Sequence, residues 1–171
     1  MPKNVYNNIE GHRLLCDGRV CEDVTKVGLP TITHPTTTIS AAGMAVDVDM
    51  PNTTHLEAME LSITHNNGVN CQYLSEPGKH SIELRTARQN YTTAKGEIGH
   101  ASFKVRAVGV VKETQKGDIE TGSPYGSTVK YSLLRYEEEL DGEIVTLIDA
   151  MANIIKVNGI DYTSPVENLL K

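Results

Sequence analysis

Apolar and polar residues alternate in the segment that follows residue 126. Val129, Tyr131 and Leu133 occupy one parity, and Lys130 and Ser132 occupy the other. A period of two places successive side chains on opposite faces of a strand. This segment is therefore predicted to be a strand with one buried face.

Two dipeptides that favour tight turns punctuate the region that follows. Asp141-Gly142 ends the first alternating run, and Asn158-Gly159 ends a second apolar run. A two-residue hairpin turn of type I′ needs positive φ at both central residues, which Asp-Gly and Asn-Gly pairs adopt readily. The sequence predicts a hairpin at the first dipeptide and a further turn at the second.

The apolar run between these two turns fits two kinds of element. Helical spacing is matched by Ile144, Leu147, Ile148, Met151, Ile154 and Ile155. Strand-like spacing is matched by Val145, Leu147, Met151, Ile155 and Val157. The period favours a helix, whereas the β-branched residues and the preceding turn favour a strand. These residues alone leave both alternatives open.

Two more alternating runs, 44–50 and 56–64, predict a hairpin whose polar tip is at 52–55, where Pro51-Asn52 turns the chain. The threonine-rich segment 31–40 before it predicts an extended arm that its own subunit does not bury. A strand edge and an apolar strip left exposed in this way are typical of surfaces that meet another chain. The apolar positions of the first run are Met44, Val46, Val48 and Met50.

The remaining pattern predicts a mostly β chain. Further strands are expected at 20–27, 81–91 and 98–111, a long exposed loop at 112–125, and short helical segments at 69–75 and after Pro165. The predicted fold class is two packed antiparallel sheets, sandwich-like or barrel-like, with one short flanking helix and a long projecting hairpin.

The length, charge and composition of the chain argue against several classes of function. The length of 171 residues suits one domain, 1–171, and the formal charge of −6 argues against a basic footprint for duplex nucleic acid. Aromatic residues make up 5% of the chain and tryptophan is absent, so stacking platforms for single strands are poorly supplied. No apolar run approaches the ~18 residues of a membrane span. The N-terminus has no apolar signal region, so synthesis in the cytoplasm is expected.

Candidate chemistry is sparse. Asp47 and Asp49 would point the same way from a strand and could hold a divalent cation, but any half-exposed acidic strand shows this spacing. The histidines lie singly, without zinc-ligand spacing, and no nucleophile motif or phosphate-binding loop occurs. We expect no catalytic residue, cofactor or metal, and keep a metal-dependent enzyme using the two aspartates as a remote alternative. Three cysteines without a Cys-x-x-Cys pair are expected to be idle or buried thiols: Cys16, Cys21 and Cys71.

The run Glu137-Glu138-Glu139 precedes the first turn dipeptide. A solvated hairpin end explains it most simply. A wall that repels polyanions is the functional alternative.

The chain resembles the major tail tube proteins of contractile bacteriophage tails, the group that also serves R-type bacteriocins. The most diagnostic block is Asp141-Gly142-Glu143 with Ile148-Asp149 and the run 153–161. Earlier blocks at 24–30, 42–47, 56–60 and 104–113 occur in the same order and spacing. The C-terminal residues after Asp161 depart from the family, which usually carries a basic, more polar tail.

The resemblance implies a structural protomer. Six copies would form a ring whose inner strands close into one barrel, and rings would stack into a hollow conduit for DNA ejection. It implies that Glu143 to Val157 is a strand with a bulge, and that the 44–63 hairpin contacts the next ring. The implied stacking residues are Met44, Val46, Val48, Met50, Asn52, Leu56 and Met59. The implied inner-barrel strand residues are Phe103, Val105, Leu133, Val145 and Leu147.

The same resemblance implies the partners and the place of action. They are further copies of the chain, the tail sheath, the baseplate and tape-measure proteins, with DNA passing the bore unbound and no membrane contact. The expected location is a virion tail or bacteriocin particle assembled in the bacterial cytoplasm. The alternative is the inner tube of an R-type bacteriocin or a secretion-like injection apparatus.

Overall fold

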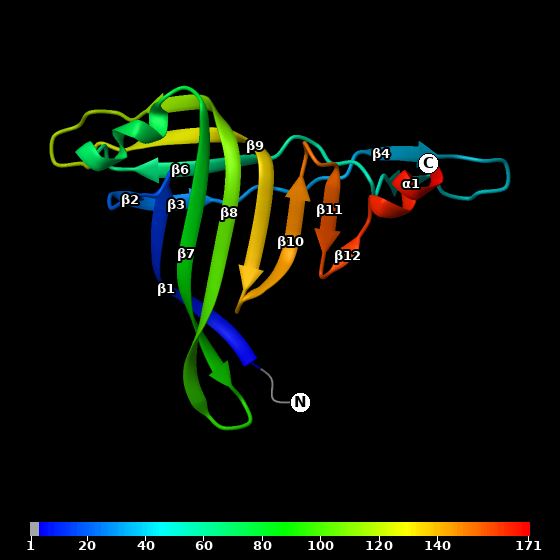
Figure 1. Ribbon diagram of the computed structural model, residues 1–171, viewed down its shortest axis with the longest axis horizontal. Coiled ribbons are helices and arrows are strands. Elements are labelled where there is room, and N and C mark those ends of the chain that lie inside the picture. The colour runs from blue at the N-terminus through cyan, green and yellow to red at the C-terminus, as the bar shows by residue number, and fades with distance from the viewer. Residues whose placement is uncertain (1–3) are drawn as a thin grey trace.

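An antiparallel sheet of long strands forms the body of the protein (Figure 1). In the computed structural model, which describes residues 4–171, this sheet contains ten strands. They are β1 (Asn4–Cys16), β2 (Arg19–Cys21), β3 (Val24–Gly28), β6 (Glu60–His65), β7 (Lys79–Thr92), β8 (Glu97–Lys116), β9 (Ser127–Leu140), β10 (Glu143–Asp149), β11 (Ile154–Val157) and β12 (Ile160–Asp161).

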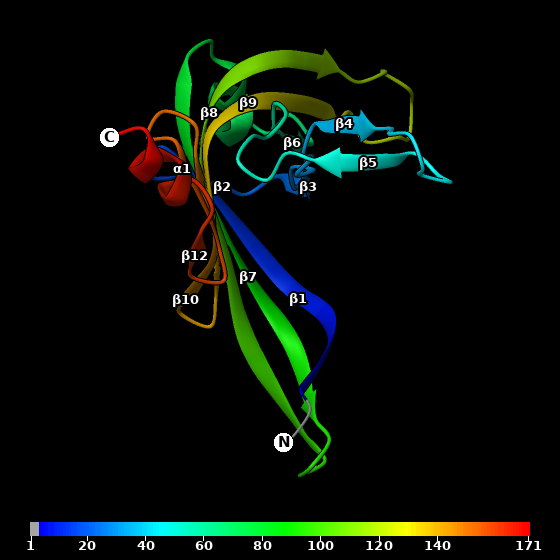
Figure 2. The same ribbon diagram turned by 90° about the vertical axis from the view of Figure 1, so that its right-hand side faces the viewer.

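The sheet bends because β9 changes its partner halfway along. Residues 127–132 of β9 pair with β6, and residues 135–140 pair with β10. The neighbouring strand β8 shifts register at Val108/Gly109 and again at Val111/Glu113, and such bulges increase local twist. At the first shift, a Cβ on Gly109 would lie 3.0 Å from the carbonyl oxygen of Ser132. Figure 2 shows β8 and β9 arching over β6 and β3, which gives two layers.

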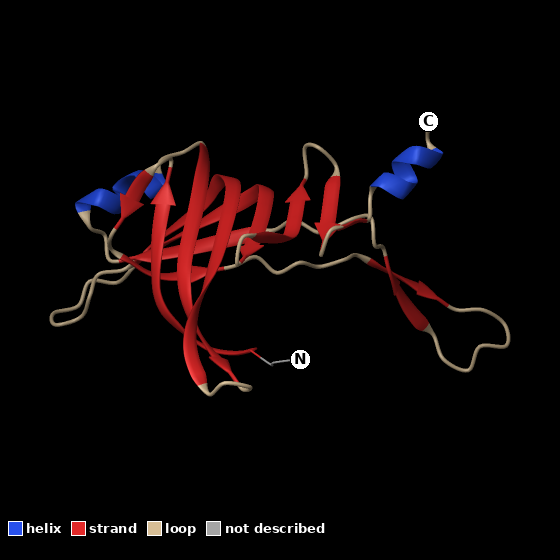
Figure 3. Ribbon diagram, turned by 60° about the horizontal axis from the view of Figure 1, so that its bottom comes forward, coloured by secondary structure: helices blue, strands red, loops and turns tan. Residues whose placement is uncertain are grey.

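The core lies between these layers. The apolar positions of β9 that the alternation predicted to be buried, Val129, Tyr131 and Leu133, all face it. The 3₁₀ helix η1 (Val69–Ser75), predicted as a helical segment, closes one end (Figure 3). The Tyr131 hydroxyl donates a hydrogen bond of 2.5 Å to the buried Leu74 carbonyl, which ties η1 to the sheet. The three cysteines are also buried there, each as a free thiol.

The turn predictions are confirmed. Asp141 and Gly142 have φ of 49° and 89°, and Asn158 and Gly159 have φ of 50° and 79°. The short helix α1 (Ser164–Leu169) contains Pro165 near its start, as predicted. Among the described residues, no helix has the length and apolar character needed to cross a membrane.

The helical alternative for 144–157 is wrong, and the strand implied by the resemblance needs correction. The run forms β10 and β11, which pair with each other across a turn. Asp149 Oδ1 accepts hydrogen bonds from the backbone N–H groups of Met151 and Ala152, and Asn153 has φ of 53°. The expected bulge is present as a register shift between Ile144 and Thr146 against β9.

Two other expectations differ from the structure, and one strand was missed. The strand expected at 20–27 is divided into β2 and β3. The loop expected at 112–125 begins only after β8 ends at Lys116. The long strand β1 was not predicted, because ten of its thirteen residues are exposed and its sequence carries no alternation.

The predicted pairing of 44–50 with 56–64 is wrong. The projecting hairpin consists of β4 (Thr36–Ile39) and β5 (Val48–Pro51), which pair with each other. Its base is closed where the Asn52 N–H donates to the Pro35 carbonyl. The second run instead joins the main sheet as β6, where Leu61 and Ile63 are fully buried. Burial of these side chains favours that arrangement over a solvent-exposed hairpin.

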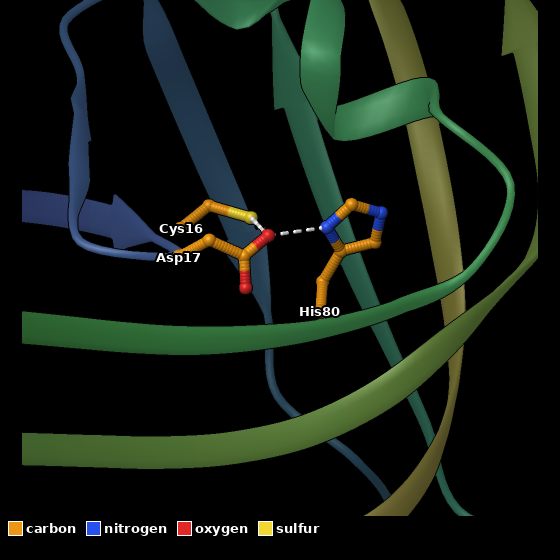
Figure 4. Close-up of side chains that lie close together, drawn as sticks. All are labelled: Cys16, Asp17 and His80. Atoms are coloured by element: carbon orange, nitrogen blue, oxygen red, sulfur yellow. Dashed lines mark hydrogen bonds and ion pairs between the residues drawn. The ribbon is translucent and has the colours of Figure 1, made fainter.

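An ion pair between the buried His80 and the exposed Asp17 fastens the turn after β1 to the start of β7 (Figure 4). His80 Nδ1–H donates to Asp17 Oδ2 at 2.7 Å, and Nε2–H donates to the Glu76 carbonyl at 2.9 Å. Asp17 also accepts the Ser81 backbone N–H at 2.8 Å. Both ring nitrogens face acceptors, and this arrangement favours the imidazolium form of His80.

Replacing Tyr131 by Phe is expected to lower the free energy of unfolding by ~1–3 kcal/mol, because the buried Leu74 carbonyl loses its donor. Urea denaturation checks this. Tyr125→Phe, at a more exposed tyrosine, is the matched control and should change stability by less than ~0.5 kcal/mol. Equal losses in the two variants would contradict the proposed tie.

His80→Gln is expected to destabilise the protein most near pH 6, by ~1–2 kcal/mol after allowing for solvent screening. Burial lowers the His80 pKa, but the Glu76 carbonyl and the Asp17 carboxylate outweigh it and raise the pKa above 6.5. This contribution is complete below pH 6.5 and is lost as pH rises through the folded-state pKa. The measurement is the difference in unfolding free energy between wild type and variant from pH 2 to 9.

The difference in unfolding free energy between wild type and His80→Gln should also become smaller in acid. Burial raises the Asp17 pKa, but the Ser81 N–H and His80 outweigh burial and lower the pKa below 3.8. The stability that Asp17 contributes is therefore lost as pH falls through this lowered, folded-state pKa. The buried His65, whose pKa is lowered by desolvation, titrates in both proteins and cancels in the difference. A difference that is independent of pH would refute the imidazolium.

Candidate assembly surfaces

The projecting hairpin, residues 36–51, extends away from the body of the protein (Figure 1). Thr38 Oγ1 donates to Asp49 Oδ1 at 2.6 Å across its two strands. A two-stranded hairpin alone is marginally stable in water, and this one carries large apolar side chains into solvent. Those exposed apolar residues are Ile39, Met44, Val46, Val48 and Met50.

The predicted stacking residues separate into three groups. Met44, Val46, Val48 and Met50 lie on the projecting hairpin, and Val46 is 73% exposed. Asn52 and Leu56 lie at its base, where the Asn52 side chain accepts the Thr54 N–H and Leu56 packs half-buried against the core. Met59 is buried in the core beside Leu133, whose N–H donates to the Met59 carbonyl. We therefore leave Met59 out of the candidate stacking surface.

The predicted inner-barrel residues lie on β8, β9 and β10 but face in different directions. Phe103, Val105 and Leu133 point towards the core. Leu147 is opposite Glu137 in the β9–β10 register and so shares the outer face of the sheet. Val145 is half-buried at the bulge of β10.

A tongue made from the ends of β1, β7 and β8 projects beyond the two-layered body (Figure 2). Within the described residues, β2 covers only residues 14–16 of β1, which leaves the outer edge of 4–13 unpaired. On the opposite side, pairing between β8 and β9 starts at Phe103, and the backbone N–H and carbonyl of Ser102 bond to Asp141, which leaves 97–101 as a second open edge. Unpaired strand edges can accept a strand of another chain.

The tongue also carries apolar and aromatic side chains. Ile9 and Ile98 are each 64% exposed. The Arg88 guanidinium lies 4.5 Å from the ring centre of Tyr6 and 5.2 Å from that of Phe103. Aromatic residues and arginine are enriched in the parts of interfaces that carry the binding energy.

Charged side chains of both signs cover the outer face of β8, β9 and β10, the face opposite the core. The strand registers place Lys104 opposite Glu139, and Arg106 and Leu147 on either side of Glu137. We call the set of charged residues on this face the charge lattice. Its members are Lys104, Arg106, Arg135, Glu137, Glu139 and Asp149.

Each cation of the charge lattice has a carboxylate partner. Arg106 donates to Glu137 at 2.5 Å and to Glu139 at 2.8 Å, and Lys104 donates to Glu139 at 2.9 Å. Arg135 joins Glu137 at 3.1 Å and Asp149 at 3.6 Å. The Lys104 and Arg106 contacts lower the pKa of Glu139, and Glu137 with Glu139 raises the pKa of Arg106.

The glutamate run is therefore neither a solvated hairpin end nor a free acidic wall. Glu137 and Glu139 belong to the charge lattice, whereas Glu138 lies on the opposite face and accepts the Tyr136 hydroxyl at 2.5 Å. The signal that could have shown this is the alternation of Lys104 and Arg106 against that of the glutamates, since opposite charges pair across neighbouring strands.

The arrangement offers little to a metal ion. Asp47 and Asp49 lie on the projecting hairpin, and the group of metal-ligand type found in the described residues is instead Cys16, Asp17 and His80. Both nitrogens of His80 are already engaged. Burial, the Asp17 charge and Cys21 raise the pKa of Cys16 to about 12, so it is a thiol at neutral pH.

Comparisons with known proteins bear on these surfaces. A sequence profile of the phage tail tube protein FII family matches residues 7–170. No curated protein sequence matches the chain. The solved structures that resemble it include two from an extracellular contractile injection system called PVC.

The first is the PVC sheath-tube complex in the extended state, with 8% identity, 75% coverage of this chain, 87% of that chain and a TM-score of 0.49. The second is the PVC sheath/tube terminator in the extended state, with 10% identity, 78% and 96% coverage and a TM-score of 0.48. These likenesses are remote, so the assignment depends on the profile match, which covers nearly the whole chain. The chain belongs to the phage tail tube protein FII family.

Proposed function

We propose that six copies of this tail tube protomer form a ring, and that stacked rings form the inner conduit of a contractile tail through which DNA is ejected. The observation that supports this most strongly is the amount of assembly surface that one subunit leaves uncovered. The projecting hairpin and both edges of the tongue expose apolar side chains and unpaired backbone groups. A stable subunit in isolation gains nothing from such surfaces.

The two surfaces suit two different contacts. The open edges 4–13 and 97–101 can extend the sheet laterally, and a head-to-tail contact that closes by rotation gives a ring. The projecting hairpin lies outside the sheet and can reach a neighbouring ring. Its residues are the proposed stacking surface, with Asn52 and Leu56 at its base.

The proposed partners follow from this architecture. They are other copies of the chain, an enclosing sheath, and the baseplate and tape-measure proteins at the ends of the tube and within it. The proposed location is the tail of a virion or related particle, assembled in the bacterial cytoplasm. The subunit acts as a structural component and needs no catalytic residue.

Val46→Asp is expected to abolish tube formation while leaving the subunit folded. Val46 contributes little to the core because it is 73% exposed, so stability should change by less than ~0.5 kcal/mol. A charge buried in a stacking contact without a partner is costly, and tube yield should fall at least tenfold. Negative-stain electron microscopy of concentrated protein measures the yield.

Ile119→Asp is the matched control, because Ile119 is 87% exposed in the loop between β8 and β9. It should form tubes like wild type. Wild-type protein that remains monomeric at high concentration, even with tail components added, would contradict the proposed function. Tubes formed equally well by Val46→Asp would contradict the assignment of the hairpin.

A further inference from the structure

The charge lattice balances its charges within the subunit. It contains three cations and three carboxylates, and all of them take part in ion pairs. The neighbouring strand β7 adds the pair Glu83–Arg85, which again brings one charge of each sign. Lys104 and Arg106, opposite this pair in the β7–β8 register, continue the pattern across the sheet.

The carboxylates are the anchored members of these pairs. The side chains of Glu137 and Glu139 are 8% and 11% exposed, whereas those of Arg106 and Arg135 are 43% and 47% exposed. Each arginine is held by two carboxylates at once. The guanidinium groups therefore lie over fixed anions and are not free to extend towards a ligand.

Stability alone does not account for this pattern. Partly exposed ion pairs contribute little to folding, and burying their carboxylates carries a desolvation cost. β-branched residues or threonine would serve an ordinary outer face of a sheet equally well. What the lattice does achieve is to present arginine and lysine on a surface while adjacent carboxylates compensate their charges.

We propose that the charge lattice lines the bore of the tube and is a surface along which nucleic acid passes without binding, with Glu137 and Glu139 withholding Lys104, Arg106 and Arg135 from phosphate groups. The placement in the bore rests on the proposed function. The face is available for it, because the opposite face of the same strands is filled by the core and by β6 and β3 (Figure 2). The electrostatic affinity for phosphate comes from cations whose charge is not already compensated by carboxylates.

The first test measures binding of a fluorescent 30-base-pair DNA duplex to unassembled protein at 50 mM salt. Wild type is expected to show no binding at micromolar concentration. Glu137→Gln combined with Glu139→Gln keeps the side-chain shapes, frees the cations and should raise affinity at least tenfold. The logarithm of the binding constant should then fall with that of salt concentration with a slope of about −2 to −3, one for each freed cation.

The matched control combines Glu22→Gln with Glu57→Gln, at two exposed glutamates away from the lattice. It changes the net charge by the same amount and should not bind the duplex. Binding by the control equal to that of the lattice variant, or no binding by either, would overturn the proposal. If the double variant fails to fold, Glu139→Gln alone, which still frees Lys104, takes its place.

The second test locates the face in the tube. Ser102 is exposed and lies on the same face of β8 as Lys104, while the native cysteines are buried. Ser102→Cys in assembled tubes should react with a small maleimide and resist one carrying a large polyethylene glycol. Unassembled protein should react with both. Equal reaction of tubes with both reagents would remove the lattice from the bore.

The DNA-binding and labelling experiments distinguish failure of the proposed function from failure of the role proposed for the charge lattice. Protein that never forms tubes would defeat the proposed function, while the DNA measurement on unassembled protein would still decide whether the carboxylates withhold the cations.

Discussion

The architecture depends on one strand that forms hydrogen bonds with two different partners. The first half of β9 pairs with β6 and the second half pairs with β10, while β8 follows along its whole length. Because β6 and β10 continue from β9 in different directions, β8 and β9 must bend. One bulge in β9 at Leu134, one in β8 at Lys112 and the absence of a side chain at Gly109 permit this. The bend creates the second layer and encloses the core. It also leaves an outer face, a tongue and a hairpin that remain outside.

Local patterns predicted much of this structure. The alternation of β9, both Asx-Gly turns, the 3₁₀ helix and the C-terminal helix follow from contacts between residues near in sequence. The tight turn of residues 150–153 was missed because Asp149 and Asn153 stabilise it through an Asx interaction and a positive φ, and neither changes the hydrophobic period. The apolar spacing of the run around it could therefore not distinguish a helix from two strands.

Pairing between distant segments was harder to predict. The segment 56–64 had two suitable partners, the nearby run 44–50 and the distant strand β9, and only burial of Leu61 and Ile63 in the folded protein decides between them. The strand β1 carries few buried residues, so no periodicity identified it. The contacts made by the glutamates at 137–139 also depend on residues that are distant in the sequence. Glu138 faces the core side, and its two neighbours meet cations that lie more than thirty residues earlier in the chain.

The projecting hairpin continues into the rest of the subunit at its base, where the Asn52 N–H donates to the Pro35 carbonyl. Holding such a segment in one conformation costs backbone entropy, and in a free subunit few contacts compensate for it. If the hairpin forms the proposed stacking contact, this entropy is lost when one ring docks on another, which makes the first contact between two rings the least favourable step. A pre-existing ring that already presents an ordered docking site lowers this barrier. In the proposed tube, this barrier would favour elongation from an existing ring over spontaneous nucleation.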